Sequence, residues 1–155
     1  MIRVQTEAFD PHAESAAFAR GRGEAGALAS FIGTVRDSAH GGAVSALELE
    51  GYPGFTDKQI AKIDADARAR FDVLDTLVIH RHGRMAPGEA IVLVVALSKH
   101  RREALQAVDY LMDRLKTEAP FWKKEVRAEG SEWIEPRADD REAHARWATE
   151  ATTEE

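Results

Sequence analysis

A continuous run of eight apolar residues, Ala90–Leu97 (AIVLVVAL), constrains the fold of this chain more than any other segment. A membrane-spanning helix needs about 18 or more apolar residues, so the run is too short to be one. A strand without polar positions is typical of the centre of a sheet, where both faces are covered. The run therefore predicts a central strand with a layer of other structure on each side.

Two amphipathic segments predict long helices that could cover such a sheet. We expect Thr56 to cap the first and Ser98 to cap the second, which ends before Pro120. A shorter helix is expected from Asp10-Pro11 to about Arg20, because Pro fits the first helical position after an Asp cap. The apolar positions of the two long helices are Ile60, Ile63, Ala67 and Phe71, and then Ala104, Leu105, Val108, Leu111, Met112 and Leu115.

Further strands are expected from short alternating or apolar stretches separated by turn residues. Helices then interrupt pairs of strands in the order βαββαββαββ. This order favours an α+β sheet-and-helix fold over a doubly wound parallel sheet. The expected strands are residues 2–6, 25–35, 44–50 and 74–82, followed by a hairpin of 121–126 with 132–136 around residues 129–131.

The composition excludes several functions. The 155 residues fit one core with a small appended lobe, and they include no cysteine. Disulfides, thiolate metal sites, iron–sulfur clusters and a cysteine nucleophile are therefore excluded, and any sulfur chemistry needs sulfur brought by another molecule. A net charge of -6 disfavours nucleic acid or an anionic membrane as the main partner. Without a candidate membrane span or signal peptide, we expect a cytoplasmic protein.

The negative charge is concentrated at the C-terminus. Residues 138–155 hold six acidic residues and two arginines, whereas residues 1–137 are nearly neutral. We therefore divide the chain into a domain of residues 1–137 and an acidic tail of residues 138–155. The tail is expected to be a frayed helix or disordered, and removing residues 141–155 is expected to change neither activity nor assembly.

Basic residues gather around the end of the second long helix. Three of the six lysines, Lys116, Lys123 and Lys124, fall within nine residues. A lysine beside apolar and cationic neighbours loses its proton more easily and can act as a general base or amine nucleophile. The simpler interpretation is that Lys116 complements the helix dipole and that the other two are solvated.

A second basic group is spread along the chain. His100, Arg101 and Arg102 begin the second long helix, and Arg36 follows the strand expected at residues 25–35. Guanidinium groups together with the N–H groups of a helix N-terminus form a good receptor for phosphate. Each residue taken alone is better explained as a solvated charge.

Two pairs of ring-bearing residues allow two interpretations each. Phe121 and Trp122, beside the lysines, could stack on a flat heterocycle, although core packing is expected for at least one of them. His80 and His82 lie on one face of a strand, as two zinc ligands would. Because no third ligand is identifiable, half-exposed strand histidines are expected instead.

Six segments between Ile2 and Arg137 carry a recognisable pattern, and the run LKTEAPFWK is the most specific part of it. The segments are GALASFIGTVRD (26–37), LELEGYPGFTDK (47–58), VIHRHG (78–83), SKHRREA (98–104), YLMDRLKTEAPFWKKE (110–125) and WIEPR (133–137). Together they resemble the family of large, catalytic subunits of molybdopterin synthase, the MoaE family. Gly51 departs from the pattern, because the family often has a larger residue, commonly His, before Tyr-Pro-Gly.

The resemblance implies an α/β hammerhead-type fold with a small additional β subdomain, and a homodimer. Each large subunit would bind one small, ubiquitin-like sulfur carrier of the MoaD type. The carrier's C-terminal Gly-Gly tail ends in a thiocarboxylate and would enter a pocket of the large subunit. The implied substrate is cyclic pyranopterin monophosphate, which receives two sulfurs in turn to form the dithiolene of molybdopterin. No metal and no resident cofactor is implied.

The resemblance also implies site residues. Lys116 matches the family's catalytic lysine, and Lys123 matches its second active-site lysine. Lys116 would act as an acid/base or as the amine that engages the thiocarboxylate carbonyl, while Lys123 would stabilise negative charge on phosphate or on a developing thiolate. The implied substrate-binding residues are Thr34, Val35, Arg36, His100, Arg101, Lys116, Lys123, Lys124, Glu125 and Arg137.

Two functions from different classes follow from these observations. The first is a sulfurtransferase enzyme. The alternative is a non-catalytic module that binds a phosphorylated heterocycle or a partner's C-terminal tail on the same fold. A nucleic-acid binder is weakened by the net charge and by the lack of a continuous basic stripe.

Overall fold

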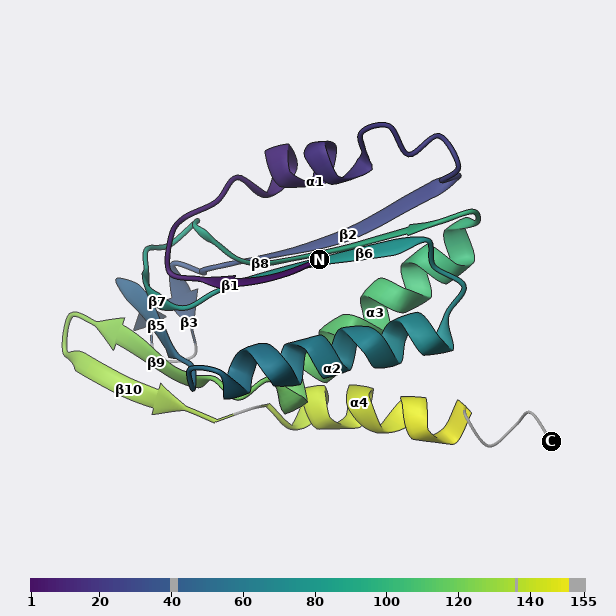
Figure 1. Cartoon of the computed structure of the whole chain (residues 1–155). Helices are drawn as coiled ribbons and strands as arrows, with labels where there is room; N and C mark the ends of the chain where they lie inside the picture. Colours follow the sequence, from purple (N-terminus) through teal and green to yellow (C-terminus); the bar gives the residue numbers. More distant parts are fainter. Residues whose placement is uncertain (40–41, 136, 151–155) are drawn as a thin grey trace.

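The computed structural model describes residues 1–39, 42–135 and 137–150, which include two four-stranded sheets, the first of them with helices packed against it (Figure 1). The first sheet has the strand order β1 (Ile2–Gln5), β6 (Asp75–Arg81), β8 (Ala90–Ser98) and β2 (Ala27–Thr34). Only β1 and β6 pair in parallel. The apolar run of residues 90–97 is therefore an inner strand, as its sequence predicts.

Helices cover both faces of this sheet, so the expected layers are confirmed. Helix α1 (Pro11–Ala19) lies on one face, and α2 (Phe55–Arg70) and α3 (Arg101–Glu118) lie on the other (Figure 1). The strand β8 contributes alternate side chains to the two layers. Val94 joins the core beneath α2 and α3, whereas Leu93 packs in the cluster that Phe18 of α1 completes.

The second sheet is the small β subdomain that the resemblance implies. Its strand order is β10 (Gly130–Ile134), β9 (Trp122–Arg127), β5 (Ala46–Glu50) and β7 (Gly83–Met85), all antiparallel. The hairpin of β9 and β10 is confirmed, whereas β7 was not expected, because three residues after a turn carry too little pattern.

The polar, glycine-ended sequence of residues 36–42 predicts a loop after β2, and this segment contains a short ribbon. It consists of β3 (Ser38–Ala39) and β4 (Gly42–Ala43), which pair with each other. Residues 40 and 41, which also belong to that expected loop, lie outside the described residues.

Asp10 caps α1 as expected, whereas the two other expected caps are wrong. The Asp10 carboxylate accepts hydrogen bonds from the backbone N–H groups of His12 and Ala13. Helix α2 begins after Gly54, whose φ of 77° suits glycine, and α3 begins after His100. Neither of these two caps supplies a side-chain hydrogen bond to its helix.

The two hydroxyls that were expected to cap helices have other partners. Thr56 Oγ1 accepts from the backbone N–H of Tyr52 at 2.8 Å and donates to the carbonyl of Pro120 at 3.3 Å. Ser98 Oγ donates to the carbonyl of Asp72 at 2.7 Å. Tertiary hydrogen bonds of this kind override the local capping preference, and sequence spacing does not reveal them.

The acidic tail forms a packed helix over its described part. Helix α4 (Ala138–Glu150) lies against α3 (Figure 1), and residues 151–155 are outside the described residues. Trp147 is buried, with its ring centroid 5.3 Å from that of Tyr110 and 5.9 Å from that of Phe71. Over residues 138–150 the tail is therefore a packed helix rather than a frayed or disordered end.

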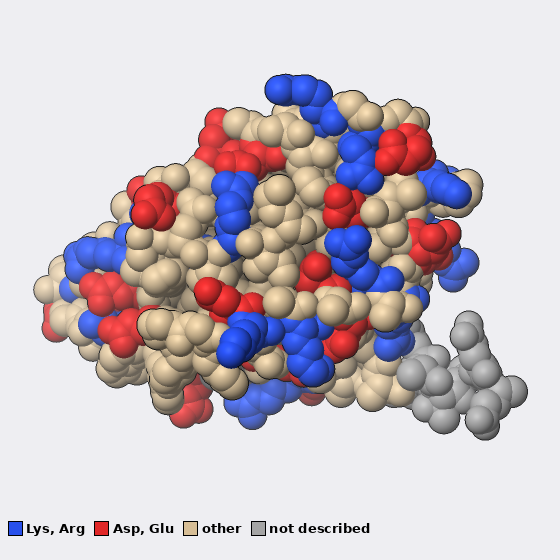
Figure 2. Space-filling model, in the orientation of Figure 1, with Lys and Arg blue, Asp and Glu red and all other residues tan. Residues whose placement is uncertain are grey.

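Charges of both signs are interspersed on the face shown in Figure 2, without a continuous basic stripe. In the part of the chain that the structure describes, none of the helices has the length and the apolar character required to cross a membrane.

Candidate active site

A small cavity lies where the end of β2 meets the β subdomain. Its volume is about 50 Å³. Three expected site residues from the end of β2 line it, Thr34, Val35 and Arg36, together with Lys123 and Glu125 from β9. Five of the residues that the resemblance implies thus meet at one place. The other lining residues are Ser38, Ala39, Val44, Leu47 and Ile91.

Local structure explains why the end of β2 faces this cavity. The pairing of β2 with β8 shifts between Gly33 and Thr34, which ends the regular strand. Val35 is buried and is held in place from both sides, because its N–H donates to the carbonyl of Glu89 and its carbonyl accepts from the N–H of Gly88. Arg36, the next residue, consequently lies at the cavity and lines it.

Strand alternation places two of the β9 side chains at the cavity. Lys123 and Glu125 are two residues apart and share one face of β9. Glu125 is buried, and its carboxylate forms an ion pair with Arg127 at 2.7 Å. The cavity therefore has a negative group beside its lysine.

Lys123 occupies an unusual electrostatic position. Burial lowers the pKa of its ammonium group, and the positive charges of Lys116 and Arg36 act in the same direction. The carboxylates of Glu125 and Asp140 oppose this shift of the pKa. Lys116, exposed on the last turn of α3, therefore lies within electrostatic reach of Lys123, although it does not line the cavity itself.

Lys124 points to the opposite face of β9 from Lys123. Its ammonium group forms an ion pair with Glu48 at 2.8 Å and lies 5.2 Å from the centre of the Trp133 ring. The hydrogen bond from Lys124 is the main cause of the lowered pKa of Glu48. Lys124 thus joins β9 to the neighbouring strand β5 through Glu48, on the face of β9 away from the cavity.

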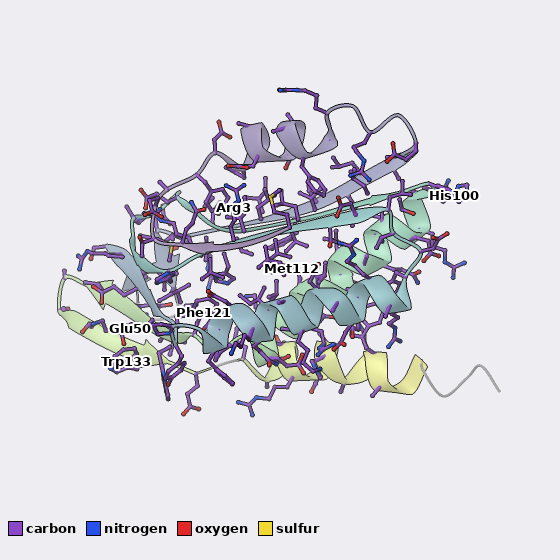
Figure 3. The ribbon with its side chains drawn as sticks, viewed as in Figure 1. Arg3, Glu50, His100, Met112, Phe121 and Trp133 are labelled. Atoms are coloured by element: carbon purple, nitrogen blue, oxygen red, sulfur yellow. The ribbon has the colours of Figure 1, made fainter. Side chains whose placement is uncertain are left out.

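His100 and Arg101 lie at the other end of α3. Figure 3 shows His100 at one end of this helix and Phe121 beyond the other end. A rise of about 1.5 Å per residue puts Arg101 about 22 Å from Lys116 along the axis. Within one chain, the expected anion-binding residues do not converge on the lysines.

Arg137 is also separate from the cavity lining. It follows β10, it is exposed, and it pairs with Asp139 at 3.6 Å.

The ring-bearing residues near the lysines divide into buried and exposed ones. Phe121 is partly buried and packs against the cores of both sheets, so the expectation of core packing holds for it. Trp122 is exposed, its indole N–H donates to the hydroxyl of Tyr52, and its ring meets that of Trp133 edge to face at 6.3 Å.

His80 is not the half-exposed strand histidine that the sequence predicts. Its side chain is buried, and its ring stacks on that of Phe121 with 4.2 Å between the centroids. Among residues 1–39, 42–135 and 137–150, no three side chains of His, Cys, Asp or Glu gather as metal ligands would.

Sequence reasoning missed the walls of the cavity and the stack on Phe121. Ala39 and Val44 have no polar side-chain group, and Ser38 is one of several serines in the chain, so no chemical signal distinguishes them. The stack depends on β6 lying close to the connection between α3 and β9, and a single sequence does not show this proximity.

Comparison with known proteins decides the family. The family model described as MoaE protein matches residues 4–118. The chain belongs to the MoaE protein family. A molybdopterin synthase catalytic subunit from Ralstonia nicotianae is 53% identical to it, over 94% of this chain and 83% of the relative.

Solved structures of MoaE proteins share the fold. The molybdopterin biosynthesis MoaE protein from Burkholderia ambifaria superposes with a TM-score of 0.80 at 46% identity, covering 96% of this chain and 97% of that one. A chain in a complex of subunits 1 and 2 of molybdopterin-converting factor from Helicobacter pylori shares the fold with a TM-score of 0.73 at 22% identity. It covers 88% of this chain and 91% of that one. The expected hammerhead-type α+β fold is thereby confirmed.

Proposed function

We propose that this chain transfers sulfur to cyclic pyranopterin monophosphate to make molybdopterin, and that Lys116 and Lys123 are its catalytic residues. One observation carries the proposal. In a chain whose relatives are molybdopterin synthase catalytic subunits, Lys123 and Arg36 line one cavity within electrostatic reach of Lys116.

The charges around the cavity suit this reaction. Positive groups beside a confined space stabilise negative charge that develops on sulfur or sits on a phosphate. Because burial and the neighbouring cations lower the pKa of Lys123, its amine exchanges a proton more readily than an exposed lysine does. The exposure of Lys116 at the end of α3 supports its proposed contact with the carbonyl of a thiocarboxylate that enters from solvent.

The sulfur comes from a second protein. The chain has no cysteine, so it has no thiol of its own to donate. A small ubiquitin-like carrier of the MoaD type with a thiocarboxylated Gly-Gly tail fits this requirement, because an extended tail is narrow enough to enter a small cavity. The proposal includes the cytoplasmic location that we expected from the sequence.

A homodimer would complete the anion-binding part of the site. Strand β2 is an edge strand, and it carries exposed apolar side chains on both faces, Leu28 and Phe31. Leu105 is also exposed on α3, which packs beneath β2. An unpaired edge with apolar flanks is a surface that a second chain covers.

The direction of β2 determines what such a dimer brings together. Its first residue, Ala27, pairs with Ser98 next to His100, and its last residue, Thr34, lines the cavity. A two-fold axis at the middle of β2 pairs the two copies of this strand antiparallel. His100 and Arg101 of one protomer then approach the cavity of its partner, and the basic residues that one chain keeps apart share a site.

Product formation tests the proposed function directly. Purified protein is mixed with thiocarboxylated carrier and precursor, and the dithiolene pterin is measured. We expect product only with the thiocarboxylated carrier and not with the same carrier ending in an ordinary carboxylate. Tight binding of both components without product would favour the non-catalytic binding module instead.

A further inference from the structure

His80 is buried and does not itself line the cavity, yet its surroundings connect it to both lysines. Its Nδ1 lies 3.0 Å from the backbone carbonyl of Arg81, and a carbonyl oxygen only accepts, so Nδ1 carries the proton. One face of its ring stacks on Phe121 with an interplanar angle of 17°. Burial lowers the pKa of His80 to about 4, with smaller contributions from His82 and Lys116, so the ring is neutral near pH 7.

Phe121 is the first ring after α3 and directly precedes β9. It packs against the core beneath the first sheet and against that of the β subdomain, so it lies at the junction of the two sheets. Gly51 lies beside this ring, because a methyl group added at Gly51 would lie 3.3 Å from Phe121 Cε1. Gly51, the departure from the family pattern, thus leaves the space that this ring uses.

Two contacts hold the chain between the two lysines. Lys116 is on the last turn of α3 and Lys123 is the second residue of β9, and six residues lie between them. The carbonyl of Pro120 is held by Thr56, and the side chain of Phe121 is held by His80. The spacing of the two ammonium groups depends on these two anchors.

We propose that His80 is a positioning residue, which through its stack on Phe121 fixes the start of β9 and hence the placement of Lys123 relative to Lys116. This inference rests on the proposed function in taking the two lysines as the catalytic residues. His80 itself is buried behind Phe121 and acts only through that ring.

Two substitutions of His80 distinguish the effect of its ring stack on Phe121 from the effect of its hydrogen bond to Arg81. His80→Phe keeps a ring against Phe121 and loses the donor to Arg81, whereas His80→Asn keeps a donor near the position of Nδ1 and loses the ring. The first measurement is the titration of the Lys123 ammonium by NMR with ¹³C-labelled lysine, assigned with Lys123→Arg. Because His80 is neutral near pH 7, replacing it removes no charge there, and a shifted Lys123 pKa reports on geometry.

We expect His80→Asn to raise the pKa of Lys123 toward the ordinary value and to lower kcat about tenfold or more, as misplaced catalytic groups do. His80→Phe is expected to stay close to the wild type in both measurements. The matched control is Leu77→Ala, which is equally buried on β6 but faces the cluster under α1 and should lower only the melting temperature.

The outcomes distinguish this inference from the proposed function. If the Lys123 titration is the same in His80→Asn, Leu77→Ala and the wild type, the positioning role is overturned. A shifted titration with unchanged kcat would support the positioning role and overturn the catalytic assignment of Lys123. If His80→Asn does not fold, Phe121→Leu removes the same stack from the other side, and the same rise in the Lys123 pKa is expected.

Discussion

The indole Nε1 of Trp147 donates a hydrogen bond to the carboxylate of Asp113 at 2.7 Å, and this contact fastens the C-terminal helix to α3. The same indole ring is buried between Phe71 and Tyr110, and Arg146 adds an ion pair to Asp109 at 2.6 Å. The helix that carries Lys116 is therefore supported from outside by a segment that its composition suggested was dispensable.

Trp147→Ala is expected to lower the free energy of unfolding by about 3 kcal/mol, the lower end of the range for removing a buried tryptophan side chain. Denaturant unfolding measures this difference. Glu142→Ala, at an exposed position of the same helix, is the control and should change stability little. Equal stability of the two variants would show that α4 does not contribute to the folded domain.

Thr56→Val tests the hydrogen bonds that hold the connection between the lysines. Valine keeps the shape of threonine but leaves the N–H of Tyr52 and the carbonyl of Pro120 without their partner. We expect a loss of about 1–3 kcal/mol in unfolding free energy and a lower kcat. Thr117→Val is the control, because the Thr117 hydroxyl bonds only to carbonyls within α3. A kcat that falls equally in both variants would contradict the special role of Thr56.

The sequence predicted the layers of the fold well because apolar periodicity reports directly on burial. The run of residues 90–97 and the apolar faces of α2 and α3 each placed an element correctly. Thr56 and Ser98 were misassigned as caps, because their hydroxyls bond to residues far away in the chain. Trp147 was overlooked because one large apolar residue in an acidic segment changes the mean composition very little.

The candidate site was predictable only in part, for a geometric reason. Arg36 and Lys123 have chemically distinctive side chains, and the fold brings both to one cavity. Lys124 has the same chemistry as Lys123, but the two-residue period of a strand turns it to the other face. Arg101 and Lys116 are far apart because they lie near opposite ends of an uninterrupted helix of 18 residues. The sequence alone does not say whether the residues of one site come from one chain or from two.

Lys116→Ala is expected to abolish nearly all product formation while the melting temperature stays near that of the wild type. Lys116 is exposed at the end of α3, so truncating its side chain removes little packing. Lys116→Arg should also be poor, because arginine does not exchange a proton near neutral pH. A single-turnover assay with thiocarboxylated carrier gives the rates, and turnover near the wild-type rate in either variant would reject the assignment.

The buried His80 predicts a pH dependence of stability. Its folded-state pKa of about 4 lies below the ordinary value of 6.5, so between these pH values the unfolded chain binds a proton that the folded chain does not. Stability should therefore be fully present above about pH 6.5 and should fall by on the order of 3 kcal/mol as the pH drops to about 4. Carboxylates also titrate in this window, so the measurement is the difference between the wild type and His80→Phe. Parallel stability curves for the two proteins would mean that His80 is not held neutral by burial.

Arg101→Ala is expected to weaken precursor binding by about 1.5–3 kcal/mol, the size of a charged hydrogen bond, and to affect carrier binding much less. Free phosphate should compete with the precursor, and more weakly in this variant than in the wild type. Calorimetric titration of precursor with and without phosphate measures both effects. Equal precursor affinities would indicate that Arg101 is a solvated surface residue.

A mixture of two impaired variants decides whether Arg101 acts across the dimer. Lys116→Ala and Arg101→Ala each damage every site of their own homodimer. Suppose that each site combines Lys116 of one protomer with Arg101 of its partner. A mixed dimer then has one site with both residues intact and one site with both residues replaced. Random exchange makes half of the dimers mixed, so about a quarter of the wild-type activity should return on mixing. If both residues served the site of their own chain, each protomer of a mixed dimer would keep its defect, and no activity would return above that of the separate variants.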